Sequence, residues 1–356
     1  MHEDPRRFLL VTTVKDEGPS IVEWVAHHRN IGFTDIVVYQ NGSTDGTQKL
    51  LRTMARHGYI QYFPNDSKRG LWQNRAYRRA SFLDVYRESD WAMVLDGDEF
   101  LSINVGDGKV ADLVDAVPKS ATAIHINWKL FGSSDRKTTS DSLVTEDFLW
   151  CEKKERIADK LVGFKAIFKP SVYVRPGIHK PKVVREGKVE RIYNGSGMRE
   201  GKYETKIWRS KDPNLRKLAQ VNHYVIRDAQ RFMIKSVRGR THEDRAISTE
   251  YWRGYNWHDE MDITLARKSA QTRATMKTMD AECNERLSML TAHARRIQKE
   301  RFDELMTQEK HRIVFSEITG EPAPPMVNKS VVDEKDPDDL ENVQTPDEIA
   351  PEEPLA

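Results

Sequence analysis

The chain has 356 residues, of which 38% are hydrophobic and 31% are charged, and its formal net charge is +2. This length allows one large domain with elaborations or two domains of unequal size. No apolar run is long enough to span a bilayer and no signal peptide is evident, so we expect a protein that stays in the cytoplasm.

Strand and helix patterns alternate along the first third of the chain. Short apolar, β-branched runs indicate strands, and apolar residues at helical spacing indicate amphipathic helices. This alternation predicts βαβ units and a doubly wound α/β domain with a parallel sheet, in which ligands bind beyond the carboxyl ends of the strands. The predicted strands lie at 8–14, 35–40, 59–63 and from Trp91, and the predicted helices lie within 19–33, 47–58 and 71–89.

The pattern changes after residue 102. Mixed strand and helix signals give way to a mostly helical, strongly basic region, and then to a tail from Thr319 that is rich in Pro, Glu and Asp. Such a tail cannot bury enough apolar surface to fold, and we predict that it is disordered. The later elements are a helix near 110–117, strands within 122–132, 162–174 and 180–193, and helices over 228–316.

Two features bear on compartment and ligands. Cys151 and Cys283 lie far apart and outside any CxxC pair, which favours free thiols over a disulfide or a thiolate metal site. The tail from Thr319 has eleven acidic residues and two lysines, so it holds about −9 and leaves about +11 on the rest. A basic body suits an anionic ligand, although a solvated basic surface is the commoner explanation.

The strand at 35–40 ends in a loop of small polar residues, QNGSTDGT. Asn41 and Asp45 offer hydrogen bonds to a ligand, and Gly42 and Gly46 permit turns that other residues disfavour. Taken alone, the loop is explained more simply as a strand-to-helix turn in which Asp45 or its neighbour Thr44 caps the next helix.

The most informative segment is VLDGDEF, an apolar strand that ends in Asp96, Gly97 and Asp98. In extended geometry two carboxylates two residues apart project to the same side. Oxygen ligands of this kind suit Mg²⁺ or Mn²⁺, which commonly share their shell with phosphate oxygens. A DxD sequence also occurs as a solvated turn, but its place after a sheet strand favours the metal site.

The ordered series VTTVKDEG, VVYQNGSTDGT, LWQNRAYRRA and VLDGDEF resembles the GT-A glycosyltransferases of family 2. With FGSS, HKPK and NHY, it is similar to the bacterial subgroup related to family 92 glycosyltransferases, over about residues 6–240. The resemblance implies a GT-A fold with a mostly parallel sheet flanked by helices. It also implies a hexosyltransferase that moves sugar from a nucleotide-diphosphate sugar to a saccharide or glycolipid acceptor with Mn²⁺ or Mg²⁺, in polysaccharide or glycolipid synthesis.

We expect the chain to divide into three regions, the first from the resemblance and the other two from composition and helical pattern. A catalytic domain occupies residues 1–240, with the nucleotide-sugar region at residues 1–102 and the acceptor region at residues 103–240. A basic helical extension follows at residues 241–318, and the acidic tail occupies residues 319–356.

The resemblance also implies roles for individual residues. Asn41 stands where family 2 has an aspartate that contacts the base, which leaves the donor base open. Asp96 and Asp98 match the metal motif, and His223 in NHY is expected as a further metal ligand or, alternatively, as a structural residue. The expected nucleotide-sugar contacts are Thr13, Lys15, Glu17, Asn41, Asp45, Gln73, Arg75 and Asp96.

An inverting reaction requires a carboxylate that takes the proton of the acceptor hydroxyl. The candidates after FGSS are Asp135, Glu146 and Asp147, with Glu146 first because relatives keep an acid near LVTE; a surface carboxylate is the alternative. His179, Lys180, Lys182, Trp128 and Trp150 have either acceptor-site or structural roles.

Three other interpretations compete with this one. The basic helices could bind nucleic acid, but no nucleic-acid motif accompanies them, and peripheral contact with an anionic membrane or a solvated face fits better. A non-catalytic protein that binds a nucleotide sugar or glycan is the main alternative, against which the DxD acids argue. A nucleotidyltransferase would need a glycine-rich phosphate loop, which VTTVKDEGPS lacks.

Overall fold

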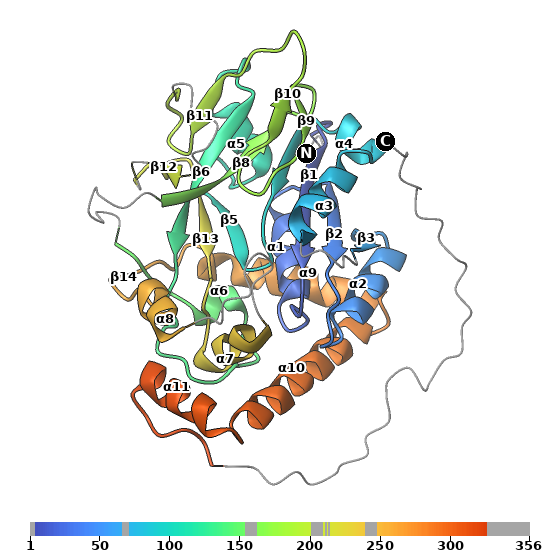
Figure 1. Cartoon of the computed structure of the whole chain (residues 1–356). Coiled ribbons are helices and arrows are strands. Elements are labelled where there is room, and N and C mark those ends of the chain that lie inside the picture. The colour runs from blue at the N-terminus through green and yellow to red at the C-terminus, as the bar shows by residue number, and fades with distance from the viewer. Residues whose placement is uncertain are drawn as a thin grey trace.

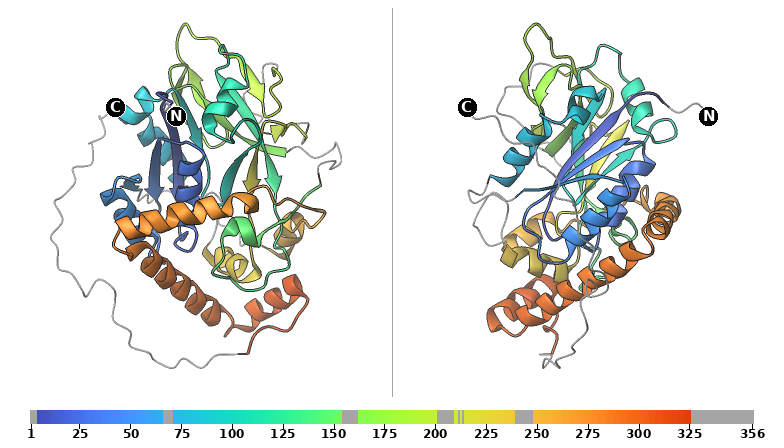
Figure 2. Two further views of the ribbon diagram at one scale, coloured as in Figure 1. Left: turned by 180° about the vertical axis from the view of Figure 1, so that it is seen from behind. Right: turned by 90° about the vertical axis from the view of Figure 1, so that its right-hand side faces the viewer.

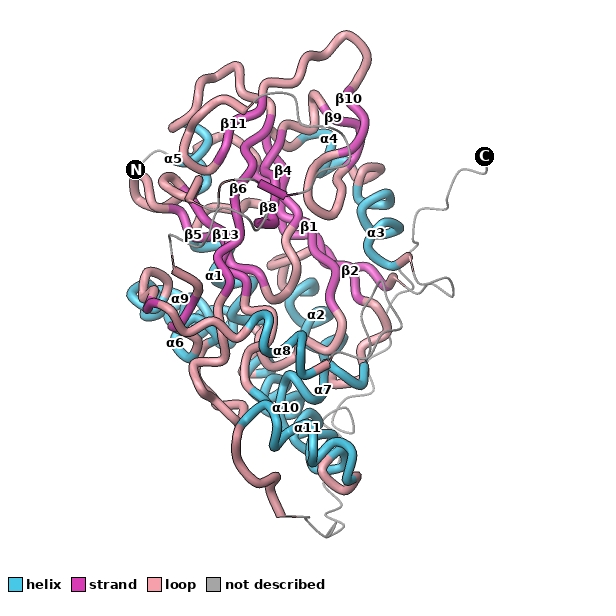
Figure 3. The backbone as a smooth tube through the Cα atoms, turned by 60° about the vertical axis from the view of Figure 1, so that its left-hand side comes forward, coloured by secondary structure: helices cyan, strands magenta, loops and turns pink. Residues whose placement is uncertain are grey.

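A computed structural model of the chain describes residues 4–65, 71–153, 162–200, 209–210, 212, 214–238 and 248–325. Most of the predicted disordered tail therefore lies outside the described residues. Figure 1 shows a central sheet with helices around it, and Figure 3 shows the strands in the middle of the molecule with several C-terminal helices gathered at one end.

The first four sheet strands are parallel, as the alternating pattern predicted, and lie in the order β3-β2-β1-β4. Their apolar runs are continuous because both faces of this part of the sheet are covered. Leu10 and Val38 face α1 and α2, whereas Leu9 and Val11 face α3. The elements are β1 (Phe8–Val14), α1 (Ile21–Asn30), β2 (Asp35–Gln40), α2 (Thr47–Arg56), β3 (Gln61–Pro64), α3 (Trp72–Ala80), α4 (Asp84–Glu88) and β4 (Trp91–Val94).

Two of the predicted boundaries differ from the observed ones. The helix expected over 71–89 is divided, since α3 ends at Ala80 and α4 begins at Asp84. The third strand begins at Gln61, because the Tyr59 amide still donates to the Met54 carbonyl at the end of α2.

Beyond β4 the sheet is mixed. The order continues β4-β8-β6-β13-β5, and β8 runs antiparallel to both of its long neighbours. β13 runs parallel to β6 and antiparallel to β5. The strand expected over 162–174 stops at Phe168, and Pro170, which has no N–H to donate, follows. The elements are β5 (Glu99–Ile103), α5 (Val110–Asp115), β6 (Ala123–Leu130), α6 (Val144–Asp147), β7 (Trp150–Cys151), β8 (Val162–Phe168), β9 (Tyr173–Arg175), β10 (Lys182–Val184), β11 (Ile192–Asn194), β12 (Arg209–Ser210) and β13 (Ala219–His223).

The C-terminal part is helical, as expected. Seen from behind, α9 crosses α1, and α10 runs below α2 and α7 (Figure 2). A separate apolar cluster that includes Phe232, Trp252, Phe302 and Phe315 joins α7, α8, α10 and α11. No helix within the described residues combines the length and apolarity of a membrane span. The elements are α7 (Ala229–Arg238), α8 (Thr249–Tyr255), β14 (Glu260–Met261), η1 (Ala266–Lys268), α9 (Ser269–Glu282), α10 (Arg286–Leu305) and α11 (Glu309–Thr319).

Candidate active site

The predicted donor residues gather at the carboxyl edge of the parallel strands. The turn 15–18 follows β1, the turn 41–46 follows β2, and Asp96 to Asp98 follow β4. Because β1 lies between β2 and β4, the three turns are neighbours. We call this edge the donor edge and its turns the donor turns, after the ligand predicted to bind there. The donor edge faces α7 and α10 in Figure 1, so the topology brings these turns and the C-terminal helices together.

The first two turns are tied to each other by side chains. The Asp16 amide donates to Ser43 Oγ at 2.9 Å, and the Thr44 amide donates to Asp16 Oδ1 at 2.7 Å. Asp45 is fully buried, and accepts from the Gly18 amide at 3.1 Å and from the Thr47 amide at 3.0 Å. Asp45 therefore holds the start of α2 and the first turn together, and its direct contact with a substrate stays a prediction.

Asn41 links the ends of β1, β2 and β3. The backbone N–H of Asn41 donates to the Val14 carbonyl at 2.9 Å, and the side-chain oxygen of Asn41 accepts from Asn65 Nδ2 at 2.7 Å. Asn65 also donates to the Trp72 carbonyl at 2.9 Å, at the start of α3. Sequence analysis did not find Asn65, although a polar residue directly after a strand was the signal that found Asn41.

Asp96 is fixed in orientation by two protein donors. Gln73 Nε2 donates to its Oδ1 at 2.9 Å, and Lys165 Nζ, from the middle of β8, lies 2.8 Å from its Oδ2. Lys165 is fully buried and also lies 3.2 Å from Glu99 Oε2, which in turn accepts from the Asp96 amide at 2.9 Å. Arg75, expected near Gln73, lies on the exposed side of α3.

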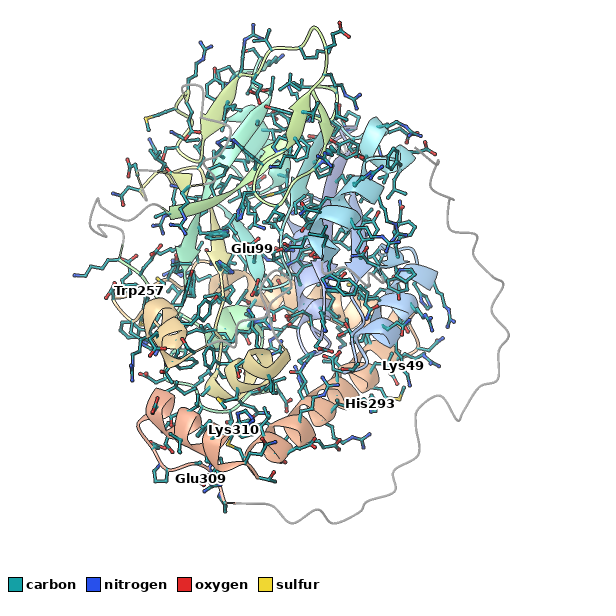
Figure 4. The ribbon with its side chains drawn as sticks, viewed as in Figure 1. Lys49, Glu99, Trp257, His293, Glu309 and Lys310 are labelled. Atoms are coloured by element: carbon teal, nitrogen blue, oxygen red, sulfur yellow. The ribbon has the colours of Figure 1, made fainter. Side chains whose placement is uncertain are left out.

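Burial and neighbouring charges shift the pKa values of Glu99 and Lys165. Burial raises the pKa of Glu99 to about 7, although Lys165 opposes the shift. Burial alone would lower the pKa of Lys165, but the charges of Asp96 and Glu99 raise it above its ordinary value. Glu99 lies near the centre of the molecule in Figure 4. Sequence analysis missed Lys165, whose signal is a lysine within the apolar strand VGFKAIF.

Asp98 lies between a histidine and a lysine. His223 Nε2, at the end of β13, is 3.6 Å from Asp98 Oδ1, and Lys235 Nζ of α7 is 2.8 Å from Asp98 Oδ2. Burial would raise the pKa of Asp98, but Lys235 and His223 hold it well below its ordinary value. The His223 ring packs on Trp128 with ring centres 4.6 Å apart, and its Nδ1 is buried without a hydrogen-bond partner in the described part of the chain.

The donor set fits a divalent cation in part. Within the described ranges no three His, Cys, Asp or Glu side chains form a cage. Both oxygens of Asp96 already accept from protein donors. One oxygen of Asp98 accepts from Lys235, whereas its other oxygen faces His223 at the end of β13. One carboxylate and one imidazole suit Mn²⁺ when substrate oxygens complete the shell, whereas Mg²⁺ prefers oxygen ligands alone. The geometry therefore favours Asp98 and His223 over Asp96 as metal ligands.

Arginines from α7 and the segment before it complete the edge. Arg227 Nη1 lies 3.0 Å from Glu17 Oε2, and its Nη2 donates to the Gly97 carbonyl at 3.1 Å. Arg231 Nη2 lies 3.0 Å from the same Glu17 oxygen. Glu17, expected to contact the nucleotide, is thus paired with two cations. Sequence analysis did not identify Arg227 or Arg231, because their place at this edge depends on the fold.

Two of the expected nucleotide contacts lie near these groups. Thr13 is buried in β1, one residue before the strand ends. Lys15 lines a groove of about 410 Å³ with Thr44, Ile234 and Arg301 among its walls. The walls of the groove come from the turns after β1 and β2 and from α7 and α10.

The proposed catalytic bases have partners elsewhere. Glu146 lies in α6 and pairs with Arg273 of α9, which holds the pKa of Glu146 below its ordinary value. Asp135 is 89% exposed, and its Oδ1 lies 3.7 Å from His258 Nε2. Asp135 has a positive φ of 56° and follows Ser134 at 51°. Asp147 accepts from Ser140 and lies 2.5 Å from Arg136.

The two acceptor-side tryptophans differ in exposure, since Trp128 is partly buried and Trp150 is exposed. Trp128 contacts both His179 and His223, whereas Trp150 is 37% exposed. Burial lowers the pKa of His179 to about 3, and its Nδ1 lies 3.1 Å from the Phe164 carbonyl, so it is a neutral packed residue. Lys182 is exposed on β10, and burial lowers the pKa of Lys180.

Residues 14–257 match the family model of glycosyltransferase family 92. The chain belongs to this family. The resemblance found in the sequence is thereby confirmed, as is the α/β class with helices flanking a large sheet. The family 92 match ends before α9, α10 and α11, so these helices lie beyond it.

More distant similarities are short. Glycosyltransferase AglJ of Haloferax volcanii is 27% identical over 94 residues, which cover 26% of this family 92 chain and 28% of AglJ. S. aureus TarS in complex with UDP has a TM-score of 0.30 and 12% identity over 47% of both chains. Glucosyl-3-phosphoglycerate synthase of Mycobacterium tuberculosis, with Mn²⁺, UDP and glucosyl-3-phosphoglycerate, has a TM-score of 0.24 and 18% identity over 35% of this chain and 44% of that one. The chain thus matches less than half the length of each of these proteins.

Proposed function

We propose that this family 92 member is a metal-dependent glycosyltransferase that moves a sugar from a nucleotide-diphosphate sugar to a saccharide or glycolipid acceptor. The observation that carries the proposal is the convergence of Asp98 and His223 beside the fixed Asp96 carboxylate, at the edge where α/β sheets bind ligands. Membership of a glycosyltransferase family supports the reaction class.

The residues of the edge suit a departing diphosphate. Cleavage of the glycosidic bond leaves negative charge on the phosphate and positive charge on the sugar. Asp98 and His223 would hold a divalent cation, which acts when bound as a Lewis acid on the leaving group. Two cations lie beside this turn. Lys235 donates to Asp98, and Arg227 donates to the Gly97 carbonyl, each within 3.1 Å. Gln73 and Lys165 keep Asp96 in one orientation, so no reorganisation is needed during the reaction.

The metal proposal is tested by Asp98→Ala. We expect donor hydrolysis with Mn²⁺ to fall at least about a hundredfold, because the leaving group loses its electrostatic partner. Hydrolysis of UDP- and GDP-sugars is measured with Mn²⁺ and again after chelation, with circular dichroism as the folding control. Asp107→Ala, in the exposed loop between β5 and α5, is the matched variant. Undiminished hydrolysis by Asp98→Ala would remove the metal site from the proposal. If the unaltered protein binds the donor but shows no turnover, the non-catalytic binding protein is favoured instead.

We propose Asp135 as the acceptor base ahead of Glu146, which reverses the order suggested by the sequence. Glu146 is occupied by Arg273, whereas Asp135 is open to solvent and has the strained backbone that is common at active sites. Asp135→Asn should lower transfer to an acceptor about a hundredfold and leave donor binding unchanged, since general bases contribute about that much. Glu146→Gln is the comparison variant. A larger loss of transfer in Glu146→Gln than in Asp135→Asn would restore the original order.

The biosynthetic role and the cellular location of the protein are also proposals. We infer a role in cell-surface polysaccharide or glycolipid synthesis at the inner face of the membrane, in the cytoplasm, from the acceptor classes that the resemblance implies. The basic composition of the body supports contact with anionic lipid. Sedimentation with vesicles that contain or lack anionic lipid tests this contact, and equal binding to both would contradict it.

A further inference from the structure

Helix α10, which lies beyond the family match, packs directly on the donor turns. Ala294 of α10 is fully buried, and a methyl group on Gly18 would lie only 2.5 Å from its Cβ. Figure 4 labels His293 on the same helix near Lys49 of α2, in agreement with the packing of these two helices. The backbone of α10 therefore comes as close to the turn after β1 as side-chain volume permits.

Gln298, one turn further along α10, joins both donor turns. It is 3% exposed, and its Nε2 donates to Asp45 Oδ2 at 2.7 Å and to the Asp16 carbonyl at 3.1 Å. Its Oε1 accepts from Arg231 of α7. A neutral amide is suited to this place because it donates to a carboxylate and a carbonyl while it accepts from a guanidinium.

The hydrogen bonds continue from Gln298 to the DxD turn. Arg231 pairs with Glu17, and the same Glu17 oxygen lies 3.0 Å from Arg227. Arg227 donates to the Gly97 carbonyl, between the two acids of the motif. Gln298, Glu17 and Arg227 also line one small cavity that reaches Asp98. One buried side chain of α10 is thus connected to all three turns of the donor edge.

We propose that Gln298 is a positioning residue for the nucleotide-sugar donor, and that α10 is part of the donor site of this chain. The proposal rests on the function proposed above. Gln298 holds the turns after β1 and β2 in one arrangement before the donor arrives, so that binding does not have to order them. Helix α10 therefore contributes to donor affinity, although the Gln298 side chain touches no reacting atom.

The test uses Gln298→Met in the full-length chain, which keeps length and volume but removes the hydrogen bonds. Calorimetric titration with UDP plus Mn²⁺, and with GDP plus Mn²⁺, gives the dissociation constant. We expect it to rise about tenfold for the nucleotide that the unaltered protein binds, as for a buried hydrogen-bonding group left without its partner. Lys299→Ala is the matched control, because Lys299 is the next residue, its side chain is 66% exposed, and it pairs only with Asp303 among described residues.

Two further measurements distinguish positioning from simple stabilisation. Thermal unfolding without nucleotide reports how much fold stability Gln298→Met loses, and all titrations are run well below the lowest midpoint. Unchanged nucleotide affinity in Gln298→Met, with or without a lower midpoint, overturns the inference. If that variant does not fold, Gln298→Asn, which keeps a neutral amide but is one methylene too short to reach both turns, replaces it with the same expectation of weaker binding. If the unaltered protein binds neither nucleotide, the proposed function fails first and this inference with it.

Discussion

At the residue scale, the donor edge is organised by buried charges that neutralise one another. The side chain of Lys165 is fully buried and lies between the carboxylates of Asp96 and Glu99. Three ionisable groups are thus in contact within the apolar interior of the sheet. Burial of such charges lowers stability unless each charge is paired and hydrogen-bonded. Removal of one partner is strongly destabilising, because it leaves an unpaired charge in the protein interior. The rigidity of Asp96 follows from this arrangement.

Glu99 should make the stability of the protein depend on pH. Its pKa is about 7 in the folded state and close to 4.5 when unfolded, so the folded state binds the extra proton between these values. The free energy of unfolding therefore falls as pH rises from about 4.5 to 7, with a contribution of up to about 3 kcal/mol.

Urea unfolding of the unaltered protein and of Glu99→Gln at several pH values measures this contribution. The difference between the two proteins isolates Glu99, since burial also raises the pKa of Glu23 and Asp228. Parallel stability curves for the two proteins between pH 4.5 and 7 would show that Glu99 does not titrate there.

At the element scale, the packing of α10 on the turn after β1 explains why residue 18 is glycine. Gly18→Ala should destabilise the protein by about 1–3 kcal/mol, because the new methyl overlaps Ala294 Cβ and neither backbone can move freely. Ala294→Gly alone should cost about 1 kcal/mol through helix propensity. In the double variant the two changes should be less costly than their sum, which a double-mutant cycle of urea unfolding measures. If the losses in unfolding free energy of the two single variants add up in the double variant, residues 18 and 294 are not in steric contact.

At the scale of the whole molecule, the ordered chain continues past α11. Gly320 ends the helix with a positive φ of 70°, Glu321 pairs with Lys137, and the Pro324 carbonyl accepts from Arg312 at 2.8 Å. These contacts join the last described segment to the body of the protein. The tail predicted from residue 319 therefore includes a short segment with defined contacts.

Two truncations locate the functional end of the chain. A protein that stops after residue 325 should keep the unfolding free energy and the nucleotide affinity of the full chain. One that stops after residue 318 should lose about 1 kcal/mol or more, because it lacks the helix end and the Glu321 contact. Thermal unfolding and the UDP titration compare the two. A marked loss of nucleotide binding in the protein that stops after residue 325 would show that the acidic tail takes part in function.

The local order of the elements followed from the sequence. Periodicity of apolar residues located the strands and helices of the first third, because each element must bury one stripe or face. Glycines and small polar residues after β2, and the acids after β4, predicted that these turns bind the ligand, because such residue types are recognisable in the local sequence. Ligand binding by these turns stays a prediction. The family resemblance rested on this ordered series of motifs.

Tertiary structure alone decided which distant residues join those turns. Lys165, Arg227 and Gln298 come from β8, from the segment before α7 and from α10. The lysine within VGFKAIF signals a buried charge but not its place in the fold, and the local sequences of Arg227 and Gln298 carry no such signal. Their positions depend on the insertion of β8 between β4 and β6, and on the packing of α10 beneath α2 and α7. Contacts of this kind depend on long-range pairing and packing, whereas local periodicity reports only which face of each element is buried.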